Sequence, residues 1–253
     1  MALFNFNKNN ITRSNGGTAC GAASYQRGEK FIDYRYGTTH NYSKREDIAY
    51  TNVLLPTNAP EKYYDSEIMW NAAELAESRS NSRVAHIFKA ALPREFSLDE
   101  NIELVNEFAT EYLVKDGMCC DIAIHDNGEG NPHTHILTPT REVTSEGFSG
   151  KRRDWNDKQL LIQWRESWAK VCNEKFLQKG LECRISHESY AVQDIDKPYQ
   201  REATVHLGKD ATALERRGVQ TELGNKNREI TERNKELELG LGLSLDRSYG
   251  FEL

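Results

Sequence analysis

Two short apolar segments, Met118–Ile124 and His133–Thr138, constrain the fold more than any other part of the sequence. The polar residues between them include Gly128, Gly130 and Pro132, which are typical of a turn, so the segments predict a β-hairpin with an eight-residue connection. The surrounding sequence mixes predicted strands and helices without a regular βαβ order. We therefore expect an α+β fold with a central antiparallel sheet flanked by helices.

Apolar periodicity and end signals predict the remaining elements. Strands are expected at 2–12, 83–92 and 181–186, and helices at 18–28, 65–81, 98–113 and 156–179. Residues 31–60 are rich in Tyr, Asn, Thr and Pro, which predicts an irregular segment. The periodic pattern weakens towards the C-terminus, where charged residues dominate. We expect one domain at 1–200 and a charged, partly helical extension at 201–253.

Composition limits the class of protein. No run of about 18 apolar residues occurs, so we expect no membrane-spanning helix. The start of the chain lacks the basic region, apolar run and cleavage site of a secretory signal. The five cysteines are an odd number without zinc-type spacing, which argues against a disulfide framework and for a reducing compartment. We therefore expect a cytoplasmic protein.

Charge is distributed unevenly along the chain. The formal net charge of -6 gives no indication of a nucleic-acid partner. Residues 1–45, however, carry a net charge of +5, and residues 46–130 carry -11. We interpret the basic start and the triplet Lys151, Arg152 and Arg153 as a path for phosphates, with Trp155 as a stacking platform. An ordinary solvated charge run explains the triplet equally well.

Three of the seven histidines fall between His125 and His135. Residues two apart on a strand point to the same face, so His133 and His135 project together while Thr134 points away. The other strand of the hairpin places His125 opposite them. Three neutral imidazoles on one face bind a divalent cation and leave coordination positions open for substrate oxygens. The pattern predicts a metal site, which would also suit hydrolysis of small esters or dioxygen chemistry.

Tyr25 lies in the Ala-rich segment that is predicted to be helical. Small residues around one aromatic ring let a helix approach a sheet closely and leave the phenol prominent. A tyrosine that attacks phosphorus gives a covalent phosphotyrosine, which conserves the bond energy for rejoining. From the residues alone, packing of Tyr25 in the core, like most of the eleven tyrosines, is the simpler interpretation.

Two motifs together resemble the MobA/MobL mobilisation relaxases, which belong to the HUH group of single-strand nucleases. The first runs from Arg13 to Lys30 and contains Ala22-Ala23-Ser24-Tyr25-Gln26-Arg27-Gly28. The second is Asn131-Pro132-His133-Thr134-His135-Ile136, preceded by His125. Supporting similarities extend the resemblance from residue 1 to about residue 230, and include Ala91-Leu92-Pro93, Trp164-Arg165-Glu166-Ser167-Trp168-Ala169 and His206-Leu207-Gly208.

The resemblance implies an HUH-nuclease fold and a relaxase domain at 1–200. It implies that Tyr25 is the nucleophile and that His125, His133 and His135 hold Mg²⁺ or Mn²⁺. The expected reaction is site- and strand-specific nicking and rejoining of DNA at a plasmid origin of transfer, with the protein left on the 5′ end through tyrosine. The expected partners are single-stranded origin DNA with a hairpin, accessory relaxosome proteins and a coupling protein.

The chain departs from the family's pattern at two positions. The strand at 83–92 carries Lys89 where the family often has Glu residues that support the metal histidines, and Glu74 and Glu77 are weak substitutes. Asn5 stands where the family commonly has a histidine. Asp126 and Glu129, in the hairpin connection, would either orient a ligand or only solvate the loop.

Three basic residues around Tyr25 are expected to clamp phosphates, although a solvated surface explains them equally well. They are Arg13, Arg27 and Lys30. Two alternatives to a mobilisation relaxase stay open. One is a rolling-circle replication initiator or transposase of the same nuclease group, and the other is a catalytically silent DNA-binding regulator.

Overall fold

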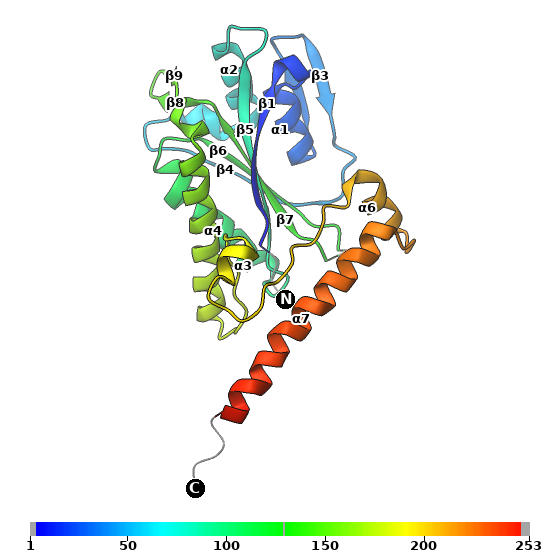
Figure 1. Ribbon diagram of the computed structural model, residues 1–253. Helices are drawn as coiled ribbons and strands as arrows, with labels where there is room; N and C mark the ends of the chain where they lie inside the picture. The colour runs from blue at the N-terminus through cyan, green and yellow to red at the C-terminus, as the bar shows by residue number, and fades with distance from the viewer. Residues whose placement is uncertain (1–3, 129, 249–253) are drawn as a thin grey trace. The chain divides into compact units, whose positions relative to one another are not determined.

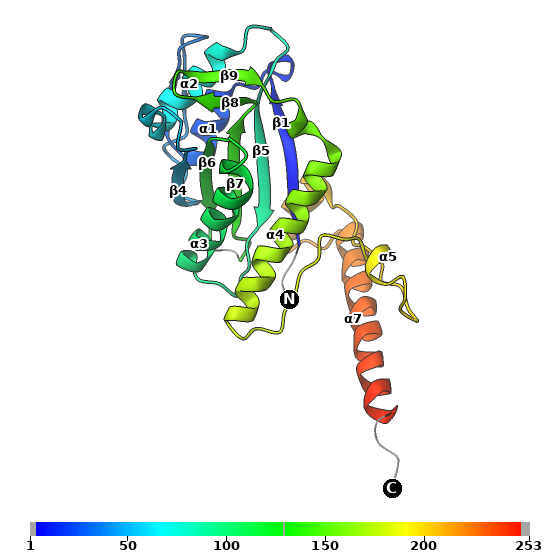
Figure 2. The same cartoon turned by 90° about the vertical axis from the view of Figure 1, so that its left-hand side faces the viewer.

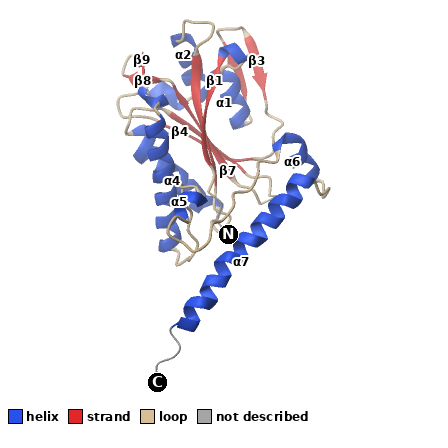
Figure 3. Ribbon diagram, viewed as in Figure 1, coloured by secondary structure: helices blue, strands red, loops and turns tan. Residues whose placement is uncertain are grey.

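The computed structural model describes residues 4–128 and 130–248. The chain divides into two compact units, with the boundary between residues 187 and 188. In the first unit, five antiparallel strands form a central sheet in the order β1-β5-β7-β6-β4, flanked by helices (Figures 1 and 3). The predicted α+β fold is confirmed. Glu129 and the first two residues of the predicted strand at 2–12 lie outside the described residues.

The strands form one sheet and two small hairpins. The sheet consists of β1 (Phe6–Thr12), β5 (Arg83–Ala91), β7 (His133–Pro139), β6 (Cys120–His125) and β4 (Ile48–Leu54). The hairpins are β2 (Lys30–Asp33) with β3 (Thr38–Asn41), and β8 (Arg141–Thr144) with β9 (Gly147–Lys151). Because β6 and β7 pair with His125 opposite His133, the predicted central hairpin is confirmed.

Four helices of the first unit begin at side-chain caps. They are α1 (Ala19–Arg27), α2 (Ser66–Ala76), α3 (Leu98–Ala109) and α4 (Lys158–Gln178). The capping side chains of Thr18, Asp65, Ser97 and Asp157 each accept a backbone N–H, and Ser97 forms the predicted capping box with Glu100. Helix α1 ends at Gly28 as predicted, because its φ of 65° is in the left-handed region that glycine tolerates.

Side chains alternate between the two faces of the sheet. One face carries Phe88 and Ile136 and packs under α3 and α4 (Figure 2), where Trp164 and Trp168 are buried as predicted. The other face carries Leu137, which packs with residues of α1 and α2. Because His133 and His135 occupy the same alternate positions of β7 as Leu137, they lie on the face that α1 and α2 partly cover.

The prediction of an irregular segment at 31–60 is wrong. This segment contains β3 and β4, and β4 is an edge strand that pairs with β6 from Ile48 opposite His125 to Leu54 opposite Cys120. Only Val53 of β4 is buried, so an apolar alternation that would mark the strand is absent from its sequence. The pairing is instead determined by β6, whose residues are all buried.

The predicted strand at 181–186 is also wrong, because this segment has no regular secondary structure. The side-chain amide of Asn173 in α4 donates to the Ile185 carbonyl over 2.8 Å and accepts from the Ile185 N–H over 2.9 Å. One side chain therefore satisfies the backbone groups that a strand partner would otherwise bind.

The second unit is mainly helical, with α5 (Tyr190–Gln193), α6 (Gly208–Arg216) and α7 (Glu222–Ser248). The helical content expected for the charged C-terminal segment is thus present. No helix in the described part of the chain combines the length and the hydropathy that a membrane span needs.

Candidate functional site

Three histidine rings converge where β6 ends and β7 begins. The ring centroids of His125 and His135 are 4.4 Å apart, and the His133 centroid lies 5.3 Å from each of them. One ligand nitrogen from each residue lies within 4.8 Å of the other two. We refer to His125, His133 and His135 as the imidazole cluster. Its geometry follows from the register of the hairpin, which sequence spacing predicted.

Hydrogen bonds orient the rings of the imidazole cluster. The Nε2–H of His125 donates to the Gln26 carbonyl over 2.7 Å, and the Nδ1–H of His133 donates to the Asn131 carbonyl over 2.9 Å. Nδ1 of His125 and Nε2 of His133 are therefore the nitrogens with a free lone pair. Nδ1 of His135 is buried without a hydrogen-bond partner among the described residues. Such an orphaned nitrogen is costly, and a bound cation would remove that cost.

Burial keeps His125 and His135 neutral. Desolvation lowers the pKa of His135 to about 2, and the neighbouring His125 and the charge of Lys89 act in the same direction. Desolvation also lowers the pKa of His125. Neutral imidazoles are the form that binds a metal, so the donor set fits a divalent cation with open coordination positions.

Tyr25 is at the surface of α1, next to the residue that contacts the imidazole cluster. The main-chain carbonyl of Gln26, the next residue in the chain, accepts the hydrogen bond from His125. The Tyr25 side chain is 46% exposed, and its ring meets Tyr42 edge-on with centroids 5.2 Å apart. The interpretation of Tyr25 as a core residue is therefore wrong, and the phenol is open to a large substrate.

Two arginines predicted to clamp phosphates are structural. The buried guanidinium of Arg13 pairs with Glu74 and donates to the carbonyls of Glu77 and Arg79. Arg27 is partly buried, and it pairs with Asp121 over 2.9 Å. These partners lie far away in the sequence, so the motif alone could not identify them. Both guanidinium groups are bound to acidic partners within the protein, so DNA contacts by Arg13 and Arg27 stay a prediction.

The basic triplet is also largely occupied by acidic partners. Lys151 pairs with Glu77 over 3.0 Å, and Arg152 forms ion pairs with Asp154 and neighbouring carboxylates. Trp155 is fully buried, which rules out its predicted role as a stacking platform for a base. Arg153 and Lys30 have exposed side chains, so they are the two members of the predicted set that solvent reaches freely.

The strand that was expected to support the histidines with carboxylates carries a lysine instead. Lys89 lies directly opposite His135 in the pairing of β5 with β7, and it is exposed. The two acidic substitutes considered from the sequence are engaged elsewhere, since Glu74 binds Arg13 and Glu77 binds Arg141 and Lys151. Asp126 accepts the Gly128 N–H, which shapes the connection between the strands.

Arg45, which no sequence motif identified, lies over the Tyr25 ring. The guanidinium carbon is 4.1 Å from the ring centroid, and Nη1 donates to the Tyr25 carbonyl over 2.9 Å. Arg45 also pairs with Asp47. The excess of basic residues in 1–45 was the only sequence signal, and it did not distinguish Arg45 from its neighbours.

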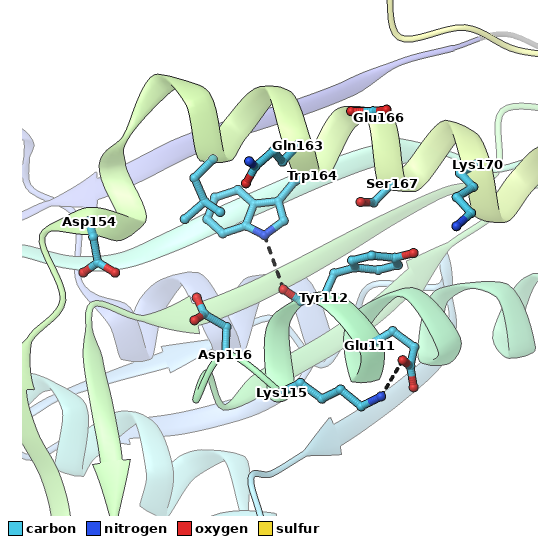
Figure 4. Close-up of a pocket in the computed structure, with 11 residues that line it drawn as sticks. Glu111, Tyr112, Lys115, Asp116, Asp154, Gln163, Trp164, Glu166, Ser167 and Lys170 are labelled. Carbon is cyan, nitrogen blue, oxygen red and sulfur yellow. Dashed lines mark hydrogen bonds and ion pairs between the residues drawn. The ribbon is translucent and has the colours of Figure 1, made fainter.

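A groove of about 730 Å³ lies elsewhere in the first unit, between the end of the α3 region and α4 (Figure 4). Its charged lining residues are mainly acidic: Glu111, Lys115, Asp116, Asp154, Glu166 and Lys170. It contains none of the residues of the imidazole cluster. An acidic groove repels phosphates, so it is a poor candidate for nucleic-acid binding.

The model of the MobA/MobL family matches residues 18–217, which is most of the chain. The chain belongs to the MobA/MobL family. Among curated relatives, this MobA/MobL protein is 31% identical to a probable mobilization protein MobA of Bifidobacterium longum, over 92% of the chain and 48% of the relative. It is 30% identical to the conjugal transfer protein TraA of Agrobacterium fabrum, over 87% of the chain and 22% of the relative. The MobA/MobL chain thus spans less than half the length of these relatives.

Two solved structures are similar to the chain. A chain from work on the molecular basis of vancomycin resistance transfer in Staphylococcus aureus is 35% identical, with a TM-score of 0.71 over 75% of the MobA/MobL chain and all (100%) of the solved chain. The conjugative relaxase TrwC, in a metal-bound complex with oriT DNA, is 12% identical with a TM-score of 0.50, over 92% of the MobA/MobL chain and 99% of the TrwC chain. The second similarity concerns the fold alone.

Proposed function

We propose that this MobA/MobL chain nicks one DNA strand at an origin of transfer and later rejoins it through a covalent phosphotyrosine intermediate. The observation that carries the proposal is the exposed Tyr25 on a helix whose next residue, Gln26, is hydrogen-bonded to the imidazole cluster. Relatives named for mobilisation and conjugal transfer support the same reaction.

In the proposed reaction, the phenol oxygen of Tyr25 attacks the scissile phosphorus. The bond between phosphorus and the 3′ oxygen breaks, and a new bond joins phosphorus to Tyr25. The phenol proton passes to water, and the departing 3′ oxygen takes up a proton. The 5′ phosphate stays attached to Tyr25, and attack by a 3′ hydroxyl reverses these steps to rejoin the strand.

The imidazole cluster would hold a divalent cation, Mg²⁺ or Mn²⁺. When bound, the cation polarises the scissile phosphate and stabilises the charge that develops on its oxygens. Three imidazole nitrogens suit Mn²⁺ better than Mg²⁺, which prefers oxygen ligands. The orphaned Nδ1 of His135 and the low pKa of that ring support a metal at this position.

The proposed substrate is single-stranded origin DNA with an adjoining hairpin, and the proposed partners are accessory relaxosome proteins and a coupling protein. Lys30 and Arg153 are the exposed basic residues that we propose as phosphate contacts. The five cysteines are free thiols, in keeping with a reaction in the reducing cytoplasm.

The test is incubation with single-stranded origin DNA and Mn²⁺, followed by a denaturing gel. We expect a covalent adduct with the unaltered chain and none with Tyr25→Phe, which removes only the hydroxyl. Tyr42→Phe is the matched control, since Tyr42 is the neighbouring exposed tyrosine, and it should still form the adduct. An adduct of equal yield with Tyr25→Phe would contradict the assignment.

A further inference from the structure

We propose that Arg45 positions the Tyr25 side chain for attack and places its guanidinium charge beside the phenol while negative charge develops on the oxygen. This inference rests on the proposed nicking function and names a further residue for it. No sequence motif singled out Arg45, and its role follows from its contacts with α1 and with the end of β6.

Arg45 contacts Tyr25 in two ways. Its guanidinium lies over the ring, 4.1 Å from the centroid, and its Nη1 donates to the main-chain carbonyl of the same residue. Tyr25 is in the last turn of α1, where its carbonyl also accepts a 3.3 Å bond from the Gly28 N–H, so Arg45 adds a second donor at the helix end. The ring is thus enclosed between Arg45 and the edge contact with Tyr42.

Asp47 holds Arg45 in this position. Its carboxylate pairs with the guanidinium, with Nε donating to Oδ1 over 2.9 Å. The main-chain carbonyl of Asp47 accepts the Asp126 N–H over 2.9 Å, and Ile48 lies opposite His125 in the sheet. The segment that carries Arg45 is therefore bound to the strand end that carries His125, which links the positions of nucleophile and imidazole cluster.

The charge of Arg45 suits the reaction. A cation over an aromatic face is attracted by the ring, and the attraction increases when the phenol loses its proton. The hydrogen bond to Asp47 chiefly raises the pKa of Arg45, with the Tyr25 phenol among the further causes, so the guanidinium stays charged. A ring fixed on two sides also loses less conformational freedom when it attacks.

The experiment measures single-turnover adduct formation at saturating origin DNA and Mn²⁺ for Arg45→Met and Arg45→Lys. We expect Arg45→Met to slow adduct formation about 100-fold, the cost of misplacing a reacting group, and DNA affinity to change less than about threefold. Free guanidinium ion at a non-denaturing concentration should restore part of the rate of Arg45→Met, and Arg45→Lys should retain an intermediate rate. Lys44→Met is the matched control, because it removes one positive charge from the adjacent position.

A second readout does not depend on nicking. Because Arg45 covers the ring, Arg45→Met should increase nitration of Tyr25 by tetranitromethane, measured by peptide mass spectrometry, while Lys44→Met should not. An Arg45→Met variant with an unchanged adduct rate and unchanged nitration would overturn this inference alone. A parallel loss of DNA affinity and rate would also overturn it, in favour of a simple phosphate contact. Absence of any adduct with the unaltered chain would instead overturn the nicking proposal and, with it, the role of Arg45.

Discussion

Helix α1 contacts two polar clusters that differ in how their charges are balanced. The first, which we call the ionic cluster, contains Arg13, Glu74, Arg27 and Asp121, and each of its cations faces a carboxylate. Asp121 also accepts hydrogen bonds from Ser66 and Trp70. The second is the imidazole cluster, where Nδ1 of His135 has no partner in the described part of the chain. The charges near it are those of Lys89 and of Arg45, which is paired with Asp47.

Whether a buried polar group has a partner of opposite charge distinguishes the ionic cluster, which we interpret as structural, from the imidazole cluster, which we interpret as functional. Burial of charged groups is tolerated where each group is paired, and the ionic cluster meets that condition. The imidazole cluster does not. Its unsatisfied nitrogen suits a metal cation, and the positive charges nearby suit a phosphate anion. Arg13 and Arg27 lie near Tyr25 in one sequence motif, but only the fold shows that they belong to the ionic cluster.

The largest expected effect is on stability, in the ionic cluster. Arg13→Met leaves Glu74 buried without its cation, and we expect it to lower the free energy of unfolding by about 3–5 kcal/mol. Urea denaturation measures this loss. The double variant Arg13→Met with Glu74→Leu should recover much of it, and the folded fraction of Arg13→Met should still form the DNA adduct. If Arg13→Met is as stable as the unaltered chain, pairing of buried charges does not stabilise the ionic cluster.

The next effect concerns the imidazole cluster. His135→Ala removes a proposed ligand, and we expect Mn²⁺ affinity to fall by at least about 100-fold, as measured by calorimetry. The matched control is His86→Gln, which changes another buried histidine of the sheet that lies on the opposite face. Unchanged Mn²⁺ affinity in His135→Ala would mean that the three rings do not hold the metal.

His86 is a buried histidine outside the imidazole cluster. Burial lowers its pKa to about 3, with the charges of Lys8, Arg83 and Lys151 acting in the same direction. Below about pH 6.5 the unfolded chain binds a proton that the folded chain refuses, so stability should fall by about 1.4 kcal/mol per pH unit as the pH drops from 6.5 towards 3. Urea denaturation of His86→Gln at pH 7 and pH 5 should show a smaller difference than in the unaltered chain. An equal difference would show that His86 does not cause the dependence.

The smallest expected effect is at Lys89, opposite His135. Lys89→Glu places a carboxylate near the proposed metal, and we expect Mn²⁺ to bind about fivefold more tightly at low salt and the gain to shrink as salt rises. Affinity for single-stranded DNA should decrease in the same variant. Lys89→Gln is the control that separates loss of the positive charge from gain of a negative one, and it should lie between the two. Weaker Mn²⁺ binding by Lys89→Glu would contradict this placement of Lys89.

Much of the imidazole cluster could be predicted from the sequence, because its geometry is local. The alternation of β7 puts His133 and His135 on one face, and a hairpin register brings in His125. Helix α1 was predictable for the same reason, since Gly28 ends it by its own backbone conformation.

Contacts between distant residues could not be predicted. Strand β4 has little apolar alternation, and it is a strand because β6 pairs with it. Trp155 looked like an exposed stacking residue, yet it is buried and donates to Asp116 over 2.7 Å. Arg45 gained its role only when folding brought it over Tyr25, a residue on a different element.

We propose Tyr25, which precedes the residue bonded to the imidazole cluster, as the residue that receives the DNA strand. Digestion of the adduct formed with origin DNA and Mn²⁺, followed by mass spectrometry, identifies the modified residue directly. We predict a nucleotide joined through its 5′ phosphate to Tyr25 and to no other tyrosine of the chain. Its recovery on Tyr42, whose ring lies 5.2 Å from that of Tyr25, or on a serine would show that Tyr25 is not the nucleophile.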